Sequence, residues 1–554
     1  MLMTSLDGKR FAEMVISGAN NLSAHAEMVD ALNVFPVPDG DTGTNMNLSM
    51  TTGAKEVQKN VQDHIGHVAS ALSKGLLMGA RGNSGVILSQ LFRGFGKFIE
   101  SKESISSLEF AAALEAGVES AYKAVMKPVE GTILTVAKDA AKQAVQTAKK
   151  HNDFILMMEE TVKAAKASLN RTPDLLPVLK EVGVVDSGGQ GLVCVYEGFL
   201  AELKGEPVNS VPATPSMTEL VSTEHHKSVQ GFMNTEDIKF GYCTEIMVKL
   251  EPEKLPFSEE KFRNDLSRLG DSLLVISDDE LVKVHVHSET PGEVLSYGQK
   301  YGSLIKIKIE NMREQHSSIV EQTHNTLNAS QQEKETQEFG IVAVSMGEGI
   351  AQVFKSIGAS SVIEGGQTMN PSTEDLLRSI KETNANKVFI LPNNKNIIMA
   401  AEQAAQVADS EVIVIPSKTV PQGMAALLAF NPSFTMEENK TSMTQALQHV
   451  KSGQITYAVR DTSIDGKTIN KNDFMGIFEG KIVEINQDQF MAAKGLLEQM
   501  LDEEAEILTV LYGEDVQEKQ LNQLIAYIHE NYQDLEVEVH NGKQPIYSYI
   551  FAVE

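Results

Sequence analysis

Apolar side chains in the N-terminal part of the chain recur at helical spacing. Leu114, Val118, Tyr122 and Val125 fall on one stripe of a helix, three or four residues apart. Alanine-rich stretches such as TVAKDAAKQAVQTAKK favour continuous helix. Alternation of β-branched and polar residues is almost absent, so residues 1–204 are predicted to form an all-α domain interrupted by glycine-rich loops.

The pattern changes after a proline-containing segment, residues 205–230, which predicts a linker. GYCTEIMVKL then predicts a strand, SEEKFRNDLSRL a helix, DSLLVISDDE and LVKVHVHSE two strands, PGEVLSYGQKYG a helix and LIKIKIENM a strand. This order, βαββαβ, is typical of ferredoxin-like folds. Residues 231–320 are therefore predicted to form an α+β middle domain.

Strands and helices alternate in the rest of the chain. Residues 321–338 are polar and predict a second linker, and residues 339–554 predict an α/β domain of two lobes that divide near residues 490–505. FMGIFEGKIVEI is predicted to be one of its strands, and VIEGGQTMNPSTEDLLRSI predicts a helix with Ser372 or Thr373 as its N-cap. Loops at the carboxyl ends of such strands line a crevice, which could hold a ligand or a partner, or could be the ordinary edge of the fold.

Composition narrows the class of protein. A chain of 554 residues with 42% hydrophobic residues is long enough for several cores. The net charge of −27 argues against nucleic acid or an anionic membrane surface as the main partner. Two cysteines do not make a disulfide scaffold, and the chain shows neither a signal-peptide pattern nor an apolar run of about 18 residues. We therefore expect a cytoplasmic protein with no integral membrane segment.

The stretch LNVFPVPDGDTGTNM places two aspartates one glycine apart after two prolines. It lacks the acid and glycine spacing of an EF-hand calcium loop. Mg²⁺ needs only one or two carboxylates, and its other ligands are waters and substrate phosphates. Asp39 and Asp41 suit that ion, with Asn33 or Asp30 as a further oxygen ligand. The alternative is a loop that turns a corner and caps a helix at Thr44.

Two further loops carry glycines before an apolar helix. They are LMGARGNSGVILSQ, residues 77–90, and VGVVDSGGQGLV, residues 182–193. Backbone N–H groups at such helix starts favour phosphate. The chain contains no GxxxxGK[ST] motif and no protein-kinase HRD or DFG set. Three glycine-rich loops, one of them with paired acids, predict a nucleotide–magnesium site that does not use a P-loop lysine.

These motifs carry a family resemblance. PDGDTGTNM, GARGNSGVILSQ, EGTILTVA and GVVDSGGQG occur in the order seen in the ATP-binding subunit of dihydroxyacetone kinases. With the domains that follow, the whole chain resembles the bacterial fatty acid kinase catalytic subunits, which are DAK2-domain proteins. The resemblance implies an eight-helix barrel that holds ATP through two Mg²⁺ ions, with Asp39 and Asp41 as metal ligands. The nucleotide contacts that it implies are Thr42, Thr44, Asn45, Asn83, Ser84, Thr132, Asp186, Ser187, Gly188 and Gly189.

The chain departs from the dihydroxyacetone kinase pattern at one metal ligand. That pattern has a third aspartate five residues before the equivalent of Asp39, whereas here the nearest match is Asn33, six residues before it. An amide oxygen can bind Mg²⁺ but brings no charge, so the third ligand stays open.

A fatty acid is a chemically reasonable acceptor. Its carboxylate, with a pKa of roughly 4 to 5, is already ionised at pH 7 and needs no general base. Repulsion from the triphosphate is the remaining obstacle, and Arg81 is a candidate cation to reduce it. The alternative is a surface arginine near a helix start. The resemblance implies that a separate DegV-family protein presents the fatty acid, that the product is an acyl phosphate, and that the chain is a homodimer.

Cys243, His285 and His287 are candidate zinc ligands in the middle domain. The two histidines lie two positions apart on one predicted strand, and the first and third strands of a βαββαβ sheet are neighbours. Each residue alone is more often structural, and the role of such a zinc, structural or mechanistic, stays open. The resemblance also points to these positions.

The C-terminal domain is similar to DegV-type proteins, and we expect it to dock the partner that carries the acyl group. Two other functions stay open for the chain. One is a kinase for dihydroxyacetone or a related polyol, which would need a substrate subunit that this chain lacks. The other is a non-catalytic regulator that binds nucleotide.

Overall fold

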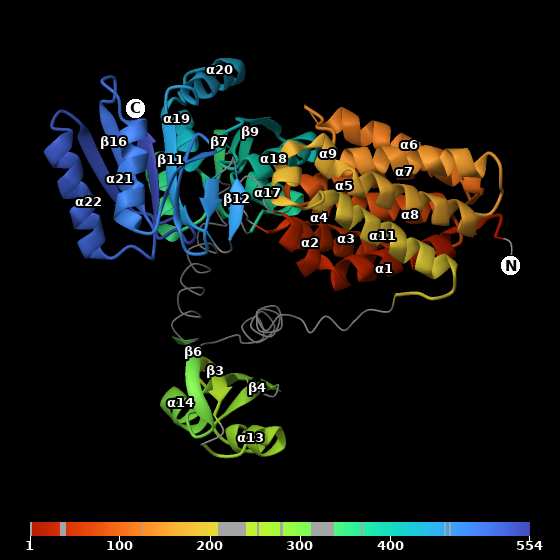
Figure 1. Cartoon of the computed structure of the whole chain (residues 1–554), viewed down its shortest axis with the longest axis horizontal. Helices are drawn as coiled ribbons and strands as arrows, with labels where there is room; N and C mark the ends of the chain where they lie inside the picture. Colours follow the sequence, from red (N-terminus) through yellow and green to blue (C-terminus); the bar gives the residue numbers. More distant parts are fainter. Residues whose placement is uncertain are drawn as a thin grey trace. The chain divides into compact units, whose positions relative to one another are not determined.

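A computed structural model of the chain is shown in Figure 1. The structure describes residues 3–33, 40–125, 127–208, 240–251, 254–277, 281–311, 337–366, 369–458, 461–464 and 467–554. Two compact units are present, one made of residues 1–211 and 336–554 and the other of residues 212–335. The two predicted linkers, residues 205–230 and 321–338, lie almost wholly outside the described residues.

The N-terminal part is a bundle of helices, called here the helical region (Figure 1). Its helices are α1 (Gly8–Ala24), α2 (Ala26–Leu32), α3 (Thr42–Lys59), α4 (Ile65–Gly79), α5 (Gly82–Ile99), α6 (Ser107–Ala124), α7 (Ile133–Ala148), α8 (Phe154–Asn170), α9 (Thr172–Leu175), α10 (Pro177–Val182) and α11 (Ser187–Leu203). A short antiparallel pair, β1 (Leu6–Asp7) and β2 (Ser104–Ile105), joins the start of α1 to the start of α6. The expectation of a helical N-terminal domain is confirmed.

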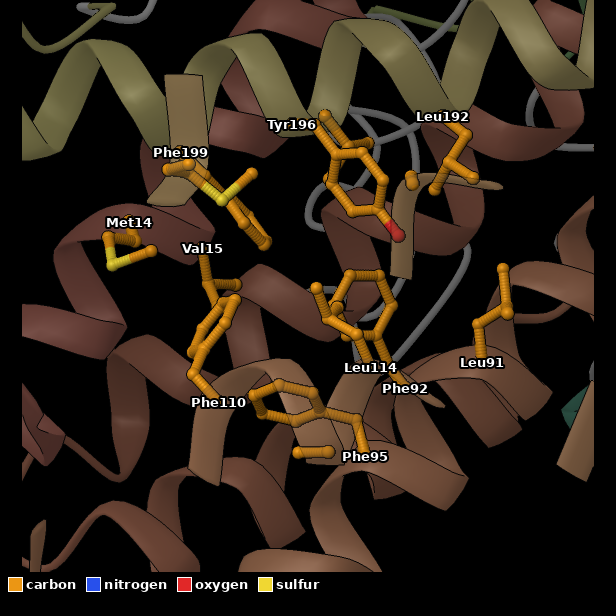
Figure 2. Close-up of a cluster of buried hydrophobic side chains, with 14 of the residues drawn as sticks. Met14, Val15, Leu91, Phe92, Phe95, Phe110, Leu114, Leu192, Tyr196 and Phe199 are labelled. Carbon is orange, nitrogen blue, oxygen red and sulfur yellow. The ribbon is translucent and has the colours of Figure 1, made fainter. Parts of the chain in front are cut away.

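An aromatic cluster fills the centre of the helical region (Figure 2). Phe95 stacks edge-to-face on Phe110, with ring centroids 5.1 Å apart, and Phe92 meets Phe199 at 6.0 Å. These rings join α5, α6 and α11. Burying each large apolar side chain contributes about 1.5–3 kcal/mol, so the helices are held from the inside.

The first and last long helices of this region touch without intervening side chains. A Cβ on Gly198 of α11 would lie only 2.5 Å from the Cα of Gly18 in α1. Only glycine at this crossing lets the two backbones approach so closely. The contact brings the start and the end of the helical region together.

The middle unit is an α+β module. It consists of β3 (Tyr242–Leu250), α13 (Glu259–Leu266), β4 (Gly270–Ser277), β5 (Leu281–Ser288), α14 (Pro291–Gly298) and β6 (Gly302–Asn311). The strands form one antiparallel sheet in the order β4-β5-β3-β6. Phe262, Tyr297 and Tyr301 pack together beneath it, with ring centroids 5.0–5.4 Å apart. The order of elements agrees with the expectation from the sequence.

The C-terminal region, residues 337–554, contains two main sheets. A parallel sheet in the order β10-β9-β7-β8 is followed by a six-stranded sheet in the order β15-β14-β11-β18-β16-β17. The strands are β7 (Gln337–Ser345), β8 (Ser361–Glu364), β9 (Ala385–Leu391), β10 (Glu411–Val414), β11 (Lys451–Tyr457), β12 (Thr462–Ile464), β13 (Lys467–Ile469), β14 (Phe474–Phe478), β15 (Lys481–Asn486), β16 (Ile507–Tyr512), β17 (Glu536–Asn541) and β18 (Tyr549–Val553). The helices are α16 (Glu348–Ser356), α17 (Thr373–Glu382), α18 (Lys395–Val407), α19 (Val420–Leu428), α20 (Met436–Ala446), α21 (Gln489–Met500) and α22 (Glu518–Asn531). The alternation of strands and helices is the one expected.

The predicted division near residues 490–505 is wrong. β11 pairs antiparallel with β18, so strands on both sides of that point belong to the same sheet. The change of sheet falls instead between β10 and β11. The last strand of the chain returns to the centre of the second sheet, and this long-range pairing leaves no local signal.

The single strand predicted over FMGIFEGKIVEI is also wrong, because it is the hairpin of β14 and β15. Glu479 and Gly480 form its turn, with φ of 49° and 79°. Two consecutive residues with positive φ are typical of the two-residue turns that match the twist of paired strands. A strand-forming sequence on both sides of the turn hid this break.

The N-cap predicted for α17 is confirmed, and it is Ser372. The Ser372 hydroxyl accepts a hydrogen bond from the N–H of Asp375, and the Asp375 carboxylate accepts one from the N–H of Ser372. This reciprocal capping box satisfies two otherwise unpaired donors of the helix.

In the part of the chain that the structure describes, no helix has the length and apolar character needed to cross a membrane.

Candidate functional site

Four helices of the helical region begin at one place. A Cβ on Gly188, in the first turn of α11, would lie 3.3 Å from the Oγ of Ser84 in α5 and 3.3 Å from the Cβ of Ile133 in α7. A Cβ on Gly82, at the start of α5, would lie 2.8 Å from the Nδ2 of Asn45 in α3. The positive dipole ends of α3, α5, α7 and α11 are therefore gathered together, an arrangement that favours an anion such as phosphate.

Asp41 is a buried carboxylate at this place. It immediately precedes α3 and is only 6% exposed, yet its side chain makes no capping hydrogen bond to that helix. Its carboxylate accepts hydrogen bonds from the side chains of Asn45 and Asn370 instead. Burial raises the pKa of Asp41 to about 6, and the charge of Asp30 adds to this effect. A positive ion at this carboxylate would remove the cost of its charge.

The cap of α3 comes from Asp30, the residue that the sequence offered as an alternative metal ligand. Its Oδ1 accepts the N–H of Thr44 at 2.9 Å and its Oδ2 accepts the Thr44 hydroxyl at 2.7 Å. The helix cap that the sequence offered as the alternative to a metal site is therefore made by Asp30 and Thr44. The Asp41 side chain has no capping role. Asn33 closes α2 through its N–H and the carbonyl of Asp30.

The remaining predicted residues of this loop are placed as follows. Thr42 and Asn45 lie in the first turn of α3 and are buried, 8% and 6% exposed. Asp39, the other member of the predicted pair, lies outside the described residues. The geometry of the pair is therefore known for Asp41 alone.

The second predicted loop faces the C-terminal region. The Arg81 guanidinium donates to the carbonyl of Asn370 at 2.9 Å and lies 3.4 Å from the carboxylate of Asp375. The Asn83 amide donates to the side chain of Asn396 at 3.1 Å. The sequence did not indicate these three partners as site residues, because they lie about 300 positions away in the chain. The local signals in their neighbourhood were the helix cap at Ser372 and the expectation that loops at the carboxyl ends of the strands line a crevice.

The third predicted loop starts α11. Asp186 is its N-cap and accepts the N–H of Gly189 at 2.7 Å. Burial raises the pKa of Asp186 to about 6, while hydrogen bonds from the N–H groups of Gly189 and Ile133 act in the opposite direction. Ser187 and Gly188 complete the turn. Thr132 immediately precedes α7, and its hydroxyl donates to the carbonyl of Val129 at 2.8 Å rather than capping that helix.

Asp186 predicts a pH dependence of stability. Its pKa is raised from 3.8 to about 6 in the fold, so its favourable contribution is present at low pH and is lost as the pH rises from about 4 to 6. Each pKa unit corresponds to about 1.4 kcal/mol, so the contribution is at most about 3 kcal/mol. Asp186→Asn keeps a capping oxygen and does not titrate. We expect its melting temperature, relative to wild type, to be higher at pH 7.5 than at pH 4.5 in scanning calorimetry. An equal difference at both pH values would contradict this assignment.

The predicted zinc ligands are described only in part. β3 and β5 are neighbours, and Cys243 pairs with His287 while Glu245 pairs with His285. His287 is buried, 4% exposed. The side chains of Cys243 and His285 are outside the described set. Among the side chains that are described, no three His, Cys, Asp or Glu residues come together as a metal site.

A cavity of about 370 Å³ lies within the C-terminal region, where β7 and β9 end. Its walls combine apolar side chains such as Met346 and Ile550 with polar ones such as Lys418. Ser345 Oγ and Gln544 Oε1 are buried in this wall and make no hydrogen bond within the described residues. The predicted crevice therefore exists, and its lining suits an amphipathic ligand.

Three family models cover most of the chain. They are the DAK2 domain over residues 36–201, the middle domain of FakA-like fatty acid kinase proteins over residues 239–319, and the C-terminal domain of the same FakA-like proteins over residues 340–554. Protein YloV of Bacillus subtilis (strain 168) is 64% identical over 554 residues, which is 100% of both chains. The chain belongs to the FakA-like fatty acid kinase family.

Other members are similar over their full length. An uncharacterized protein of Staphylococcus haemolyticus (strain JCSC1435) is 55% identical over 554 residues, and one of Staphylococcus aureus (strain USA300) is 56% identical over 553 residues, in each case 100% of both chains. In the family's domain scheme, Asp41, Arg81 and Asp186 lie in the DAK2 domain, whereas Asn370 and Asn396 lie in the C-terminal domain. The site described above is therefore built from two of the family's three domains.

Solved structures give weaker likenesses. A DegV family protein from Corynebacterium glutamicum is 15% identical, with a TM-score of 0.31, over 39% of this chain and 96% of its own. The dihydroxyacetone kinase from C. freundii in complex with AMP-PNP and Mg²⁺ is 20% identical, with a TM-score of 0.28, over 36% of this chain and 35% of its own. Scores this low do not support a comparison of sites.

Proposed function

We propose that this protein is the catalytic subunit of a fatty acid kinase, which transfers the terminal phosphoryl group of ATP to a fatty acid carboxylate and forms an acyl phosphate. Membership of the FakA-like fatty acid kinase family supports this chemistry. The observation that carries the proposal is the gathering of four helix starts around Asp41, a buried carboxylate with no capping role. Phosphate and a divalent ion are the ligands that such a place favours together.

The residues present fit Mg²⁺ and ATP. Carboxylate and amide oxygens are the donors that Mg²⁺ prefers, and we assign Asp39, Asp41 and Asn33 to it. Bound Mg²⁺ supplies charge neutralisation of the phosphates. The nucleotide contacts that we assign are Thr42, Thr44, Asn45, Asn83, Ser84, Thr132, Asp186, Ser187, Gly188 and Gly189. Since both Thr44 contacts go to Asp30, Thr44 acts there mainly by ordering the first turn of α3.

Arg81 is the cation that we assign to the incoming fatty acid carboxylate. Its guanidinium is held by the carbonyl of Asn370 and the carboxylate of Asp375. Asn370 also contacts Asp41, so the cation and the metal ligand share one neighbour. A cation held there would lower the repulsion between two anionic reactants without a proton transfer.

A separate DegV-family protein is the proposed source of the fatty acid, and the C-terminal region is its proposed docking site. Two loops of the C-terminal region, around Asn370 and Asn396, contact the helical region of the same chain. The partner would then dock on the remaining surface of the C-terminal region.

We also propose a ferredoxin-like middle domain, a homodimer, an eight-helix barrel for the helical region, and the domain limits expected from the sequence.

The test is ATP turnover by the full-length chain with a DegV-family protein loaded with fatty acid. Acyl phosphate formed only with the loaded partner would support the proposal. Free dihydroxyacetone serves as the second substrate. If it is phosphorylated and the loaded fatty acid is not, the chain is a polyol kinase. If neither reacts while ATP still binds, the chain is a nucleotide-binding regulator.

We further propose that Cys243, His285 and His287 bind Zn²⁺ in the middle unit. The pairing of Cys243 with His287, and the position of His285 two residues away, support this assignment. Purified wild-type protein is expected to contain about one zinc per chain by plasma mass spectrometry, and Cys243→Ala to contain at least about tenfold less after dialysis against a weak chelator. Cys194→Ala is the matched control, since Cys194 is buried in the helical region. Wild-type protein without zinc would contradict the assignment.

A further inference from the structure

One residue of the C-terminal region reaches into the proposed nucleotide site. Asn370 is 2% exposed, and its Nδ2 donates a hydrogen bond to the Oδ2 of Asp41 at 2.5 Å. The two residues are 329 positions apart in the chain. The main-chain carbonyl of Asn370 also accepts a hydrogen bond from the Arg81 guanidinium. Asn370 therefore touches Asp41, a proposed metal ligand, and Arg81, the cation proposed for the fatty acid carboxylate.

The segment that carries Asn370 is firmly seated on the helical region. The N–H of Thr373 donates to the carbonyl of Ala80 at 3.2 Å, and Arg81 pairs with Asp375 at 3.4 Å. Ala80 and Val86 belong to the same buried apolar cluster as Leu376 on α17. Backbone, ionic and apolar contacts thus hold Asn370 against Asp41, so their hydrogen bond does not depend on a single mobile side chain.

The side-chain amide of Asn370 also carries an acceptor oxygen. Its Oδ1 is buried and accepts no hydrogen bond within the described residues. A buried acceptor that stays unpaired costs about 1–3 kcal/mol, and native proteins seldom leave one without a functional reason. Mg²⁺ retains several waters when it binds, and each of these waters needs acceptors of this kind. The unpaired oxygen is therefore a second observation that points to a ligand at this place.

We infer that Asn370 is a positioning residue for the metal ligand Asp41, supplied to the nucleotide site by the C-terminal region. Its amide fixes one carboxylate oxygen of Asp41 and so orients the group for Mg²⁺. The inference rests on the proposed function. Hydrogen-bond partners of metal ligands typically contribute 10- to 100-fold to metal affinity. Metal binding in the helical region then requires the C-terminal region to be packed against it.

The experiment measures the Mg²⁺ concentration that gives half-maximal binding of a non-hydrolysable ATP analogue to the full-length chain. Asn370→Ala is expected to raise this midpoint about 10- to 100-fold, while saturating Mg²⁺ restores analogue binding. Gln403→Ala is the matched control. Gln403 is a buried amide of α18 that donates to the carbonyl of Leu77, so it joins the same two regions away from Asp41. Its midpoint is expected to stay within about twofold of wild type.

An unchanged or lower midpoint in Asn370→Ala would overturn the inference. An equal rise in Gln403→Ala would overturn it too, because seating alone would then explain the effect. If the alanine variant does not fold, Asn370→Ser, which keeps a smaller donor, is expected to give an intermediate midpoint, and a wild-type midpoint in that variant would count against the inference. Absence of Mg²⁺-dependent binding in wild type would instead overturn the proposed function and this inference with it.

Discussion

Replacing Asp41 by alanine is expected to lower acyl phosphate formation at least about 100-fold, because a carboxylate that binds Mg²⁺ contributes several kcal/mol to transition-state stabilisation. The Asp41 side chain makes no capping hydrogen bond to α3, so the loss would come from the site rather than from unfolding of that helix. Calorimetric titration with Mg²⁺ and an ATP analogue should show the same loss in binding. Asp41→Asn, which keeps the shape and removes the charge, should fall in the same range.

Asp63→Ala is the matched control for that experiment. Asp63 also lies in the helical region, but its side chain is 80% exposed and pairs with the exposed Lys9. Exposed ion pairs contribute little to stability, so activity and melting temperature should remain close to wild type. If Asp41→Ala retains near wild-type ATP binding and turnover, Asp41 is not a metal ligand and the proposed site is wrong.

Gly43→Ala is expected to damage both stability and activity. Gly43 is the second residue of α3, and a Cβ there would lie 2.1 Å from the carbonyl oxygen of Ala26 and 3.0 Å from the backbone nitrogen of Asp30. Since both neighbours are backbone atoms of α2, one helix must move. Overpacking of this kind costs about 1–3 kcal/mol, and a displacement of about 1 Å in a reacting group can cost about 100-fold in rate. Scanning calorimetry and the acyl phosphate assay measure the two effects.

The matched control is Gly292→Ala, the second residue of α14, around which nothing lies within 4 Å of the added Cβ. That substitution should leave both measurements unchanged or raise stability slightly, because alanine favours helix over glycine. A Gly43→Ala variant as stable and as active as Gly292→Ala would show that α2 and α3 are not packed as described.

Much of the candidate site could be predicted from local sequence. The glycine-rich loops before α5 and α11 predicted helix starts that favour an anion, and both loops do precede helices. α3 begins at Thr42, directly after the two aspartates of the acidic stretch. Local sequence did not reveal which aspartate caps α3 and which one is left for a metal ion. The capping role falls to Asp30, a residue from α2, because packing of α2 against α3 brings its carboxylate to Thr44.

The fold, like the site, could be predicted where local pattern decides it. The strands and helices of the middle unit follow from the spacing of their hydrophobic residues, and the helix cap at Ser372 follows from its residue type. The hairpin at Glu479 and Gly480 was missed because both its arms share one strand-like composition. The division of the C-terminal region was misplaced because β18 pairs with β11 across about 100 residues, and strand pairing over that distance depends on the packing of the whole region.

The sequence by itself determined the helices, the order of strands and helices along the middle unit, the glycine-rich helix starts and the family to which the chain is similar. These depend on period, residue type and motif, which act over a few neighbouring residues. Only the tertiary structure decided that α3, α5, α7 and α11 begin together, and that Asn370 meets Asp41 and Arg81. Contacts between residues hundreds of positions apart arise when separate hydrophobic surfaces are buried against each other, and no local pattern encodes them.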